Sequence, residues 1–270
     1  MRRIRIPGTD VLASRLSFGT ASLHHLPRAA DRRAHLEAAL DLGFTHFDTA
    51  PLYGFGEAER SLGEAFGSDG RVTITTKVGL YPPGGPEQSH HVVLARKIAG
   101  RLVPSLSRAR ADHSVDQARR SLDGSLRRLK RDHVAFLLLH EPDHALLATD
   151  EWERFIEDQK SRFVAFGVAG PRQSVEPFAA ITNPMGAVVQ TRDGLVSREA
   201  DFLAALRRPM QFTYGYFSER EAGTSSDTIL RDALARNRTG SIVVATRDRS
   251  RLAALAAAAV LDTHEDRPPC

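Results

Sequence analysis

Four residues that can carry or stabilise a proton occur near the ends of apolar segments. Asp48, Lys77 and His140 each close or follow such a segment, and Tyr53 comes shortly after Asp48. A neighbouring ammonium can lower the pKa of a phenol from its ordinary value of about 10, and a carboxylate would keep that ammonium charged. An imidazole can hydrogen-bond a carbonyl oxygen. Each residue alone is more often a structural polar group, but the four together indicate proton transfer at one site.

These residues require a fold that brings several strand ends together. Apolar segments alternate with amphipathic ones, which is typical of βα units and a parallel sheet. Eight strands are predicted, at residues 16–18, 46–48, 72–77, 134–139, 163–168, 187–190, 210–214 and 241–245. Eight helices are predicted, at residues 31–42, 57–66, 115–129, 150–160, 173–181, 199–207, 228–236 and 250–261. The pattern predicts an α/β fold, a single (β/α)8 TIM barrel over residues 1–270, in which active sites form where strands end.

Three local features refine this prediction. Pro7-Gly8 separates two short apolar segments, and we expect a β-hairpin there that closes the bottom of the barrel. The long connection 79–113 is expected to be a loop over the mouth of the site, because long loops in compact domains are commonly functional. Ser114 and Gln117 have the spacing of a capping box at the start of the third helix.

Composition excludes several classes of protein. The net charge is only +4, and no recognisable nucleic-acid-binding module is present, so no nucleic-acid partner is expected. The single cysteine, Cys270, rules out an intrachain disulfide framework and fits a reducing cytoplasm. No signal-peptide core follows Met1, and no apolar run is long enough to span a membrane. We therefore expect a cytoplasmic protein without membrane attachment, of unspecified oligomeric state.

The segment FDTAPLYG, residues 47–54, resembles the signature that surrounds the catalytic Asp and Tyr of the aldo-keto reductase family. Thr76-Lys77 and Leu138-Leu139-His140 resemble that family's Lys and His strands. The resemblance implies an NADP-dependent oxidoreductase that transfers hydride between a nicotinamide cofactor and a small carbonyl or alcohol substrate, sugars and lactols included. The catalytic residues that it implies are Asp48, Tyr53, Lys77 and His140, with Tyr53 as general acid and base.

The resemblance also implies where the cofactor binds. No G-x-G-x-x-G follows a strand, and the family's phosphate site lies instead at the helix after the eighth strand. Thr246 and Arg251 stand where the family's phosphate site has a hydroxyl residue and an Arg, and Arg247 adds a further cation. This arrangement favours NADP(H) as the cofactor and does not exclude NAD(H). The other cofactor-binding residues expected are Gly19, Thr20, Gln190 and Tyr214, the last chosen over Phe212 and Tyr216 as the aromatic that stacks on the nicotinamide.

Several positions depart from the family pattern. Ala169-Gly170 replaces the usual Ser-Asn, which holds the nicotinamide carboxamide, while Ala245 and Leu255 replace a phosphate-binding Lys and a polar adenine contact. The pair Ala169-Gly170 keeps open the alternative of a catalytically silent cofactor-binding barrel. A second alternative is a non-redox enzyme that uses Tyr53 and His140 for acid/base chemistry such as cyclisation or elimination. The substrate pocket is expected to be walled mainly by residues 23–26, Leu52, Phe55, Tyr81 and the long loop.

The segment HEPDH, residues 140–144, matches the H-E-x-x-H pattern of zinc proteases. That pattern binds zinc only when both histidines share one face of a helix. Here His140 follows an apolar strand and Pro142 interrupts the segment, so no metal site is predicted.

Overall fold

Eight parallel strands form a closed barrel in this computed structural model, which describes residues 1–88, 92, 99, 108–219 and 223–261. Around the barrel the strand order is β10-β11-β12-β3-β4-β5-β8-β9. The barrel strands are β3 (Leu16–Gly19), β4 (His46–Asp48), β5 (Thr73–Val78), β8 (Val134–His140), β9 (Phe163–Gly170), β10 (Val188–Arg192), β11 (Phe212–Tyr214) and β12 (Ser241–Val244). The predicted (β/α)8 barrel is confirmed.

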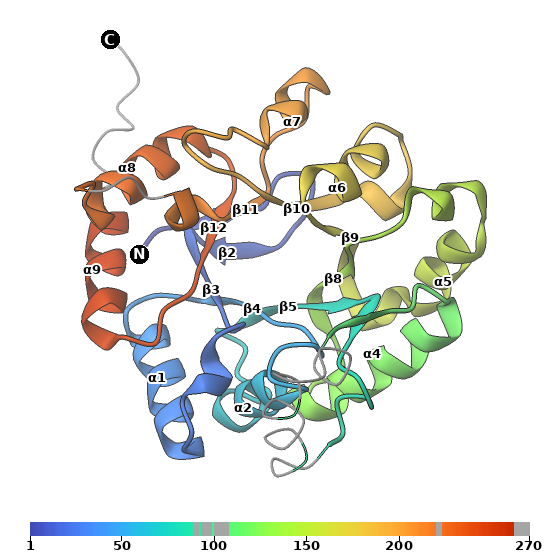
Figure 1. Ribbon diagram of the computed structural model, residues 1–270, viewed down its shortest axis with the longest axis horizontal. Coiled ribbons are helices and arrows are strands. Elements are labelled where there is room, and N and C mark those ends of the chain that lie inside the picture. Colours follow the sequence, from blue (N-terminus) through green and yellow to red (C-terminus); the bar gives the residue numbers. More distant parts are fainter. Residues whose placement is uncertain (89–91, 93–98, 100–107, 220–222, 262–270) are drawn as a thin grey trace.

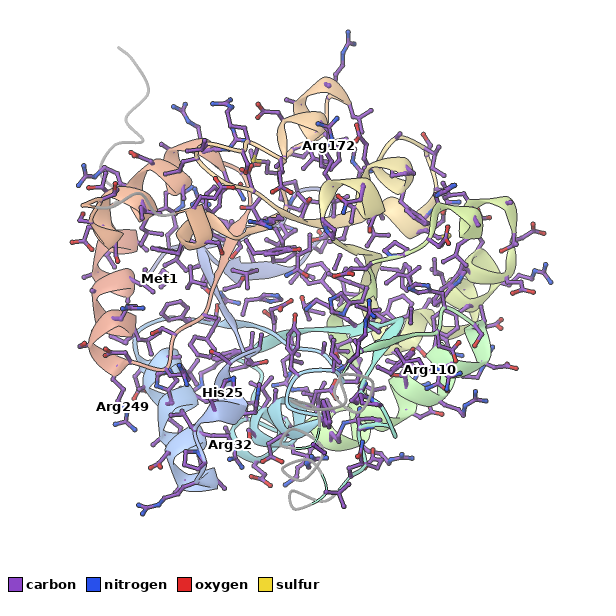
Figure 2. The ribbon with its side chains drawn as sticks, viewed as in Figure 1. Met1, His25, Arg32, Arg110, Arg172 and Arg249 are labelled. Atoms are coloured by element: carbon purple, nitrogen blue, oxygen red, sulfur yellow. The ribbon has the colours of Figure 1, made fainter. Side chains whose placement is uncertain are left out.

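Helices surround the strands on all sides (Figure 1). They are α1 (Ala29–Asp41), α2 (Glu57–Ala65), α4 (Val115–Leu129), α5 (Glu151–Gln159), α6 (Arg172–Ala179), α7 (Asp201–Ala205), α8 (Ser226–Arg236) and α9 (Arg249–Leu261). Side chains fill both the inside of the ring of strands and the layer between strands and helices (Figure 2). In the part of the chain described, no helix is both long and apolar enough to cross a membrane.

The N-terminal hairpin closes one end of the barrel, as predicted. It consists of β1 (Arg3–Arg5) and β2 (Leu12–Ser14), which pair antiparallel. Ile6 and Val11 are buried in one cluster with Phe136 and Phe212, from barrel strands. Because Phe212 is the first residue of β11, the hairpin covers the end at which the strands begin and leaves the opposite end for the site.

Two local predictions need correction. The helix predicted over 199–207 is shorter, because α7 comprises only Asp201–Ala205. Arg198 and Arg207, on either side of it, adopt left-handed backbone conformations, with φ of 48° and 55°. The helix α4 has the predicted bounds but lacks the capping box. The Ser114 hydroxyl donates a hydrogen bond to Asp112 Oδ1 at 2.7 Å, and in this orientation its oxygen accepts no hydrogen bond from an amide of the helix.

The long connection after β5 is more ordered at its base than predicted. Strand β6 (Leu80–Tyr81) pairs antiparallel with β7 (Arg110–Ala111), so the two ends of the connection are held side by side. The rest of the predicted loop falls largely on residues 89–91, 93–98 and 100–107, which lie outside the described residues, as does Cys270.

A histidine lies in the barrel interior, below the site. His46 is fully buried, with Nδ1 2.8 Å from Thr73 Oγ1 and Nε2 2.9 Å from Thr75 Oγ1, and its ring stacks on Phe212. Burial, aided by the charge of Lys77, lowers the pKa of His46 to about 3. The imidazole is therefore neutral in the folded protein throughout the neutral and mildly acidic range.

This neutral histidine predicts a loss of stability in acid. In the unfolded chain His46 takes up a proton below its ordinary pKa of about 6.5, whereas the folded protein does so only near pH 3. The unfolding free energy should therefore fall, by up to about 1.4 kcal/mol per pH unit from this residue, as the pH drops from 6.5 towards 3. Urea unfolding measured across that range should show a shallower slope for His46→Gln than for the wild-type protein. Equal slopes would contradict the assignment.

Candidate active site

A cavity of about 520 Å³ opens at the carboxyl ends of the barrel strands. Its lining combines residues that follow different strands, because the βα connections of a parallel barrel converge at this end. The predicted site residues that line it are Gly19, Asp48, Tyr53, Lys77, His140, Gln190, Tyr214 and Arg251. The tetrad predicted from the sequence is thus brought together in one place.

Lys77 and Asp48 form a buried ion pair at the floor of this cavity. Lys77 Nζ lies 2.7 Å from Asp48 Oδ1 and donates a second hydrogen bond to the Thr49 carbonyl at 3.0 Å. Gln190 Nε2 donates to the same Asp48 oxygen at 2.9 Å. Since both charged side chains are at most 5% exposed, each depends on the other for compensation of its charge.

Tyr53 lies directly beside this ion pair. Its hydroxyl is 3.4 Å from Lys77 Nζ, which is also 5.0 Å from the centroid of the Tyr53 ring. The expectation of a lowered phenol pKa is not met: burial, with contributions from the charges of Asp48 and Glu141, raises the pKa of Tyr53 well above its ordinary value. Burial disfavours the charged phenolate, and the negative charges of Asp48 and Glu141 act in the same direction although Lys77 is near. The phenol is thus protonated at neutral pH and available as a proton donor.

His140 faces Tyr53 across the cavity. The two ring centroids are 6.3 Å apart and the rings are perpendicular. Burial, followed by the charges of Lys77 and His113, lowers the pKa of His140 to about 3, so the imidazole is neutral. Its Nδ1 is buried and has no hydrogen-bond partner among the described residues. A neutral imidazole and a protonated phenol can together hydrogen-bond one carbonyl oxygen between them.

Phe212, Tyr214 and Tyr216, the three candidates for the aromatic that stacks on the nicotinamide, lie in different surroundings. Tyr214 lines the cavity. Phe212 is buried in the lower part of the barrel, and the Tyr216 hydroxyl donates a hydrogen bond to Asp193 Oδ2 at 2.7 Å, away from the cavity lining. Only Tyr214 of the three is therefore positioned to contact a ligand in the cavity.

Gln190 provides a test of whether a nicotinamide fits this cavity. Its Nε2 is engaged by Asp48, but its buried Oε1 has no hydrogen-bond partner within the described chain. A buried acceptor without a partner is costly, and a ligand N–H donor would satisfy it. The carboxamide of a nicotinamide carries such donors, so the residues present fit this group.

Three expected cofactor residues do not line the cavity. The Thr20 hydroxyl donates to the Asp48 carbonyl at 2.9 Å, so Thr20 holds the backbone of a tetrad residue in place. Thr246 Oγ1 accepts a hydrogen bond from the Asp248 amide at 3.1 Å, and Arg247 is exposed outside the lining. Their role in cofactor binding therefore stays a prediction from sequence position.

The amino end of α9 is occupied by a carboxylate of the chain itself. Asp248 Oδ1 accepts hydrogen bonds from the amides of Ser250 and Arg251 at 2.8 and 3.3 Å, as an N-cap does. A phosphate bound at this helix end would compete with Asp248. Of the cations predicted here, Arg251 is the one that reaches the cavity lining.

The expected pocket walls are also corrected. Residues 23–26, Leu52, Phe55 and Tyr81 are not among the residues that line the cavity, and the described part of the long loop contributes no lining residue. The loop after β11 contributes Phe217 and Ser218 instead. A further residue of the lining, Glu141, follows His140 directly, and the same strand-end rule that identified His140 could have identified it.

The zinc-protease pattern does not form a metal site. His140 ends β8, whereas His144 begins an exposed 3-10 turn, so the two are not on one helix. Among the described residues, no cluster of three or more His, Cys, Asp or Glu side chains could hold a metal ion.

Comparison with known proteins gives a consistent result. The sequence profile of the aldo/keto reductase family matches residues 15–166, which is more than half of the chain. Pyridoxal 4-dehydrogenase from Microbacterium luteolum is 32% identical over 152 residues, covering 49% of this chain and 41% of that protein. A 6-dehydroglucose reductase from Novosphingobium aromaticivorans is 29% identical over 178 residues, covering 62% of this chain and 50% of that protein. The chain thus matches half or less of the length of these relatives.

Solved structures share the whole fold. An aldo-keto reductase from Klebsiella pneumoniae, solved in complex with NADPH, superposes with a TM-score of 0.66 over 100% of this chain and 98% of that chain. The sequence identity is 18%, so this likeness is evidence of the common fold.

Proposed function

Because this chain belongs to the aldo/keto reductase family, we propose that it is an NADP-dependent oxidoreductase that transfers hydride between the cofactor and a small carbonyl or alcohol substrate. One observation carries the proposal. Tyr53 and His140 face each other in a cavity, and the Tyr53 hydroxyl lies 3.4 Å from a lysine that is held by a buried carboxylate. This arrangement supplies a proton donor and two hydrogen-bond partners for a single substrate oxygen.

In carbonyl reduction, the bound cofactor supplies the hydride. Tyr53 donates its proton to the substrate oxygen as negative charge develops there, and Lys77 stabilises the phenolate that remains. His140 hydrogen-bonds the same oxygen and so orients the carbonyl carbon. Asp48 keeps Lys77 in place and charged, and the Thr49 carbonyl holds the same ammonium from a second side. Alcohol oxidation uses the same groups in reverse.

Binding of the cofactor is the first requirement of this function. Calorimetric titrations with NADPH and with NADH should give a micromolar dissociation constant for NADPH and a weaker one for NADH. A screen of small aldehydes, ketones and sugars, followed through NADPH absorbance, would then identify the substrate. Binding of neither nucleotide would reject the redox function and favour non-redox acid/base chemistry or a catalytically silent scaffold.

Arg251 should determine the preference for NADP(H). Arg251 lines the cavity at the β12 side, and its guanidinium can pair with the phosphate that distinguishes NADPH from NADH. We expect Arg251→Ala to raise the dissociation constant for NADPH roughly tenfold and to change that for NADH little.

The matched control for this variant is Arg249→Ala. Arg249 begins the same helix but lies on the outside of the molecule, away from the cavity lining (Figure 2). Equal losses of NADPH affinity in the two variants would indicate a general effect of charge and contradict a specific phosphate contact.

A further inference from the structure

Glu141 is a carboxylate of the cavity that the tetrad chemistry does not use. It follows the last residue of β8 and has an uncommon left-handed backbone conformation for a non-glycine residue, with φ of 47°. Its amide donates a hydrogen bond to the Ala169 carbonyl at 2.7 Å, which holds this conformation. The first loop residue after the strand is thus fixed at the cavity rather than directed along the loop.

Gly170 leaves the space that this side chain needs. A Cβ atom at position 170 would lie 3.2 Å from Glu141 Cγ and 3.3 Å from Glu141 Cα, closer than ordinary contact. A larger residue at position 170 would therefore press on Glu141. The small pair Ala169-Gly170, which removes two hydrogen-bonding side chains from the cavity, also accommodates a negative charge there.

The charges of the cavity are unequal at its two sides. Asp48 and Lys77 neutralise each other, and the lowered pKa of His140 leaves it neutral, so Glu141 gives this side a net negative charge. No cation within the described ranges pairs with the Glu141 carboxylate. Arg251 provides positive charge, and it follows β12, which lies diametrically opposite β8 in the closed barrel.

Such a cavity is complementary to a ligand with a cation at one end and phosphates at the other. The oxidised nicotinamide ring is a cation, whereas the reduced ring is neutral. In the proposed function the ring would lie near Tyr53 and His140, because these residues would hold the substrate oxygen and hydride transfer requires contact. Burial, with smaller contributions that include the charge of Glu141, also raises the pKa of Tyr214, so the field of Glu141 extends over this region.

We infer that Glu141 makes this cavity bind the oxidised cofactor more tightly than the reduced cofactor. This inference rests on the proposed function. Since transfer of hydride to the carbonyl would leave positive charge on the ring, the Glu141 carboxylate would favour that direction and slow release of the oxidised cofactor. Glu141 acts through its charge and takes no part in the proton transfer.

The test is calorimetric binding of NADP⁺ and NADPH to the wild-type protein and to Glu141→Gln, at one ionic strength. The wild-type protein should bind NADP⁺ more tightly than NADPH. The variant should bind NADP⁺ about tenfold more weakly, with less than about a threefold change for NADPH, because the two nucleotides carry the same phosphates and differ only in the charge of the nicotinamide ring. Because Glu141 is exposed and Gln has the same shape, folding should be unaffected.

Asp143→Asn is the control, since it removes the same charge from the same loop but at a residue outside the cavity lining. It should leave the ratio of the two dissociation constants unchanged. An unchanged ratio in Glu141→Gln, in a protein that binds both nucleotides, would overturn the inference and leave the proposed function intact. A wild-type protein that binds neither nucleotide would overturn the proposed function itself.

Discussion

Replacing Tyr53 by Phe is expected to lower kcat for carbonyl reduction by about 10²–10⁴-fold, the usual contribution of a positioned proton donor. The substitution removes one oxygen atom and leaves the ring, whose edge contact with His140 and position beside Lys77 are kept. The dissociation constant for NADPH should therefore stay within about twofold of the wild-type value. Steady-state turnover on a substrate identified by the screen, with calorimetry for the cofactor, measures both quantities.

Tyr81→Phe is the matched control for this experiment. The Tyr81 hydroxyl is also buried and accepts a hydrogen bond from the Gly79 amide at 3.0 Å, but Tyr81 does not line the cavity. The Tyr81→Phe variant should have a lower free energy of unfolding and a wild-type kcat. If Tyr53→Phe retains wild-type kcat, or if both variants lose activity equally, Tyr53 is not the proton donor.

The second large effect is expected for Lys77→Met. The substitution leaves the Asp48 carboxylate buried with only the Gln190 amide as a side-chain donor, and removal of one partner of a buried ion pair typically costs about 3–5 kcal/mol. Turnover should also be lost, because no cation remains to stabilise the Tyr53 phenolate. Urea unfolding followed through the fluorescence of Trp152, the only tryptophan, measures the change in stability.

A double variant separates the two effects of Lys77. In Asp48→Asn with Lys77→Met, no uncompensated charge remains, so part of the lost stability should return while turnover stays absent. If the single variant unfolds at the wild-type urea concentration, the ion pair does not contribute to stability as the geometry indicates.

The local features of the fold could be predicted because they depend on short-range patterns. Each apolar segment predicted as a barrel strand overlaps an observed strand, and α4 has the predicted bounds, since apolar periodicity reports which face of a segment is buried. The ends of elements were less predictable. The helix α7 is shorter than predicted at both ends, because Arg198 before it and Arg207 after it adopt left-handed conformations, which residue type does not specify.

For the site, too, some residues could be predicted from their place in a short sequence pattern, whereas others depended on contacts made only in the folded protein. Asp48, Lys77 and His140 were identifiable because a polar residue at the end of an apolar strand must lie at the open end of a barrel. Thr20 and Thr246 have suitable positions along the chain, yet their hydroxyls bond to Asp48 and Asp248. Which way a hydroxyl turns depends on the partners that folding brings to it.

The sequence by itself determined which groups meet at the carboxyl ends of the strands, because parallel strands and their order of connection place all strand ends on one side. Only the tertiary structure decided the protonation of those groups and the charge around them. Burial together with the Asp48 carboxylate raises the pKa of Tyr53 despite the nearby Lys77, and the space at Gly170 admits Glu141. Desolvation and free space depend on atoms from many segments, so they exist only after the barrel has closed.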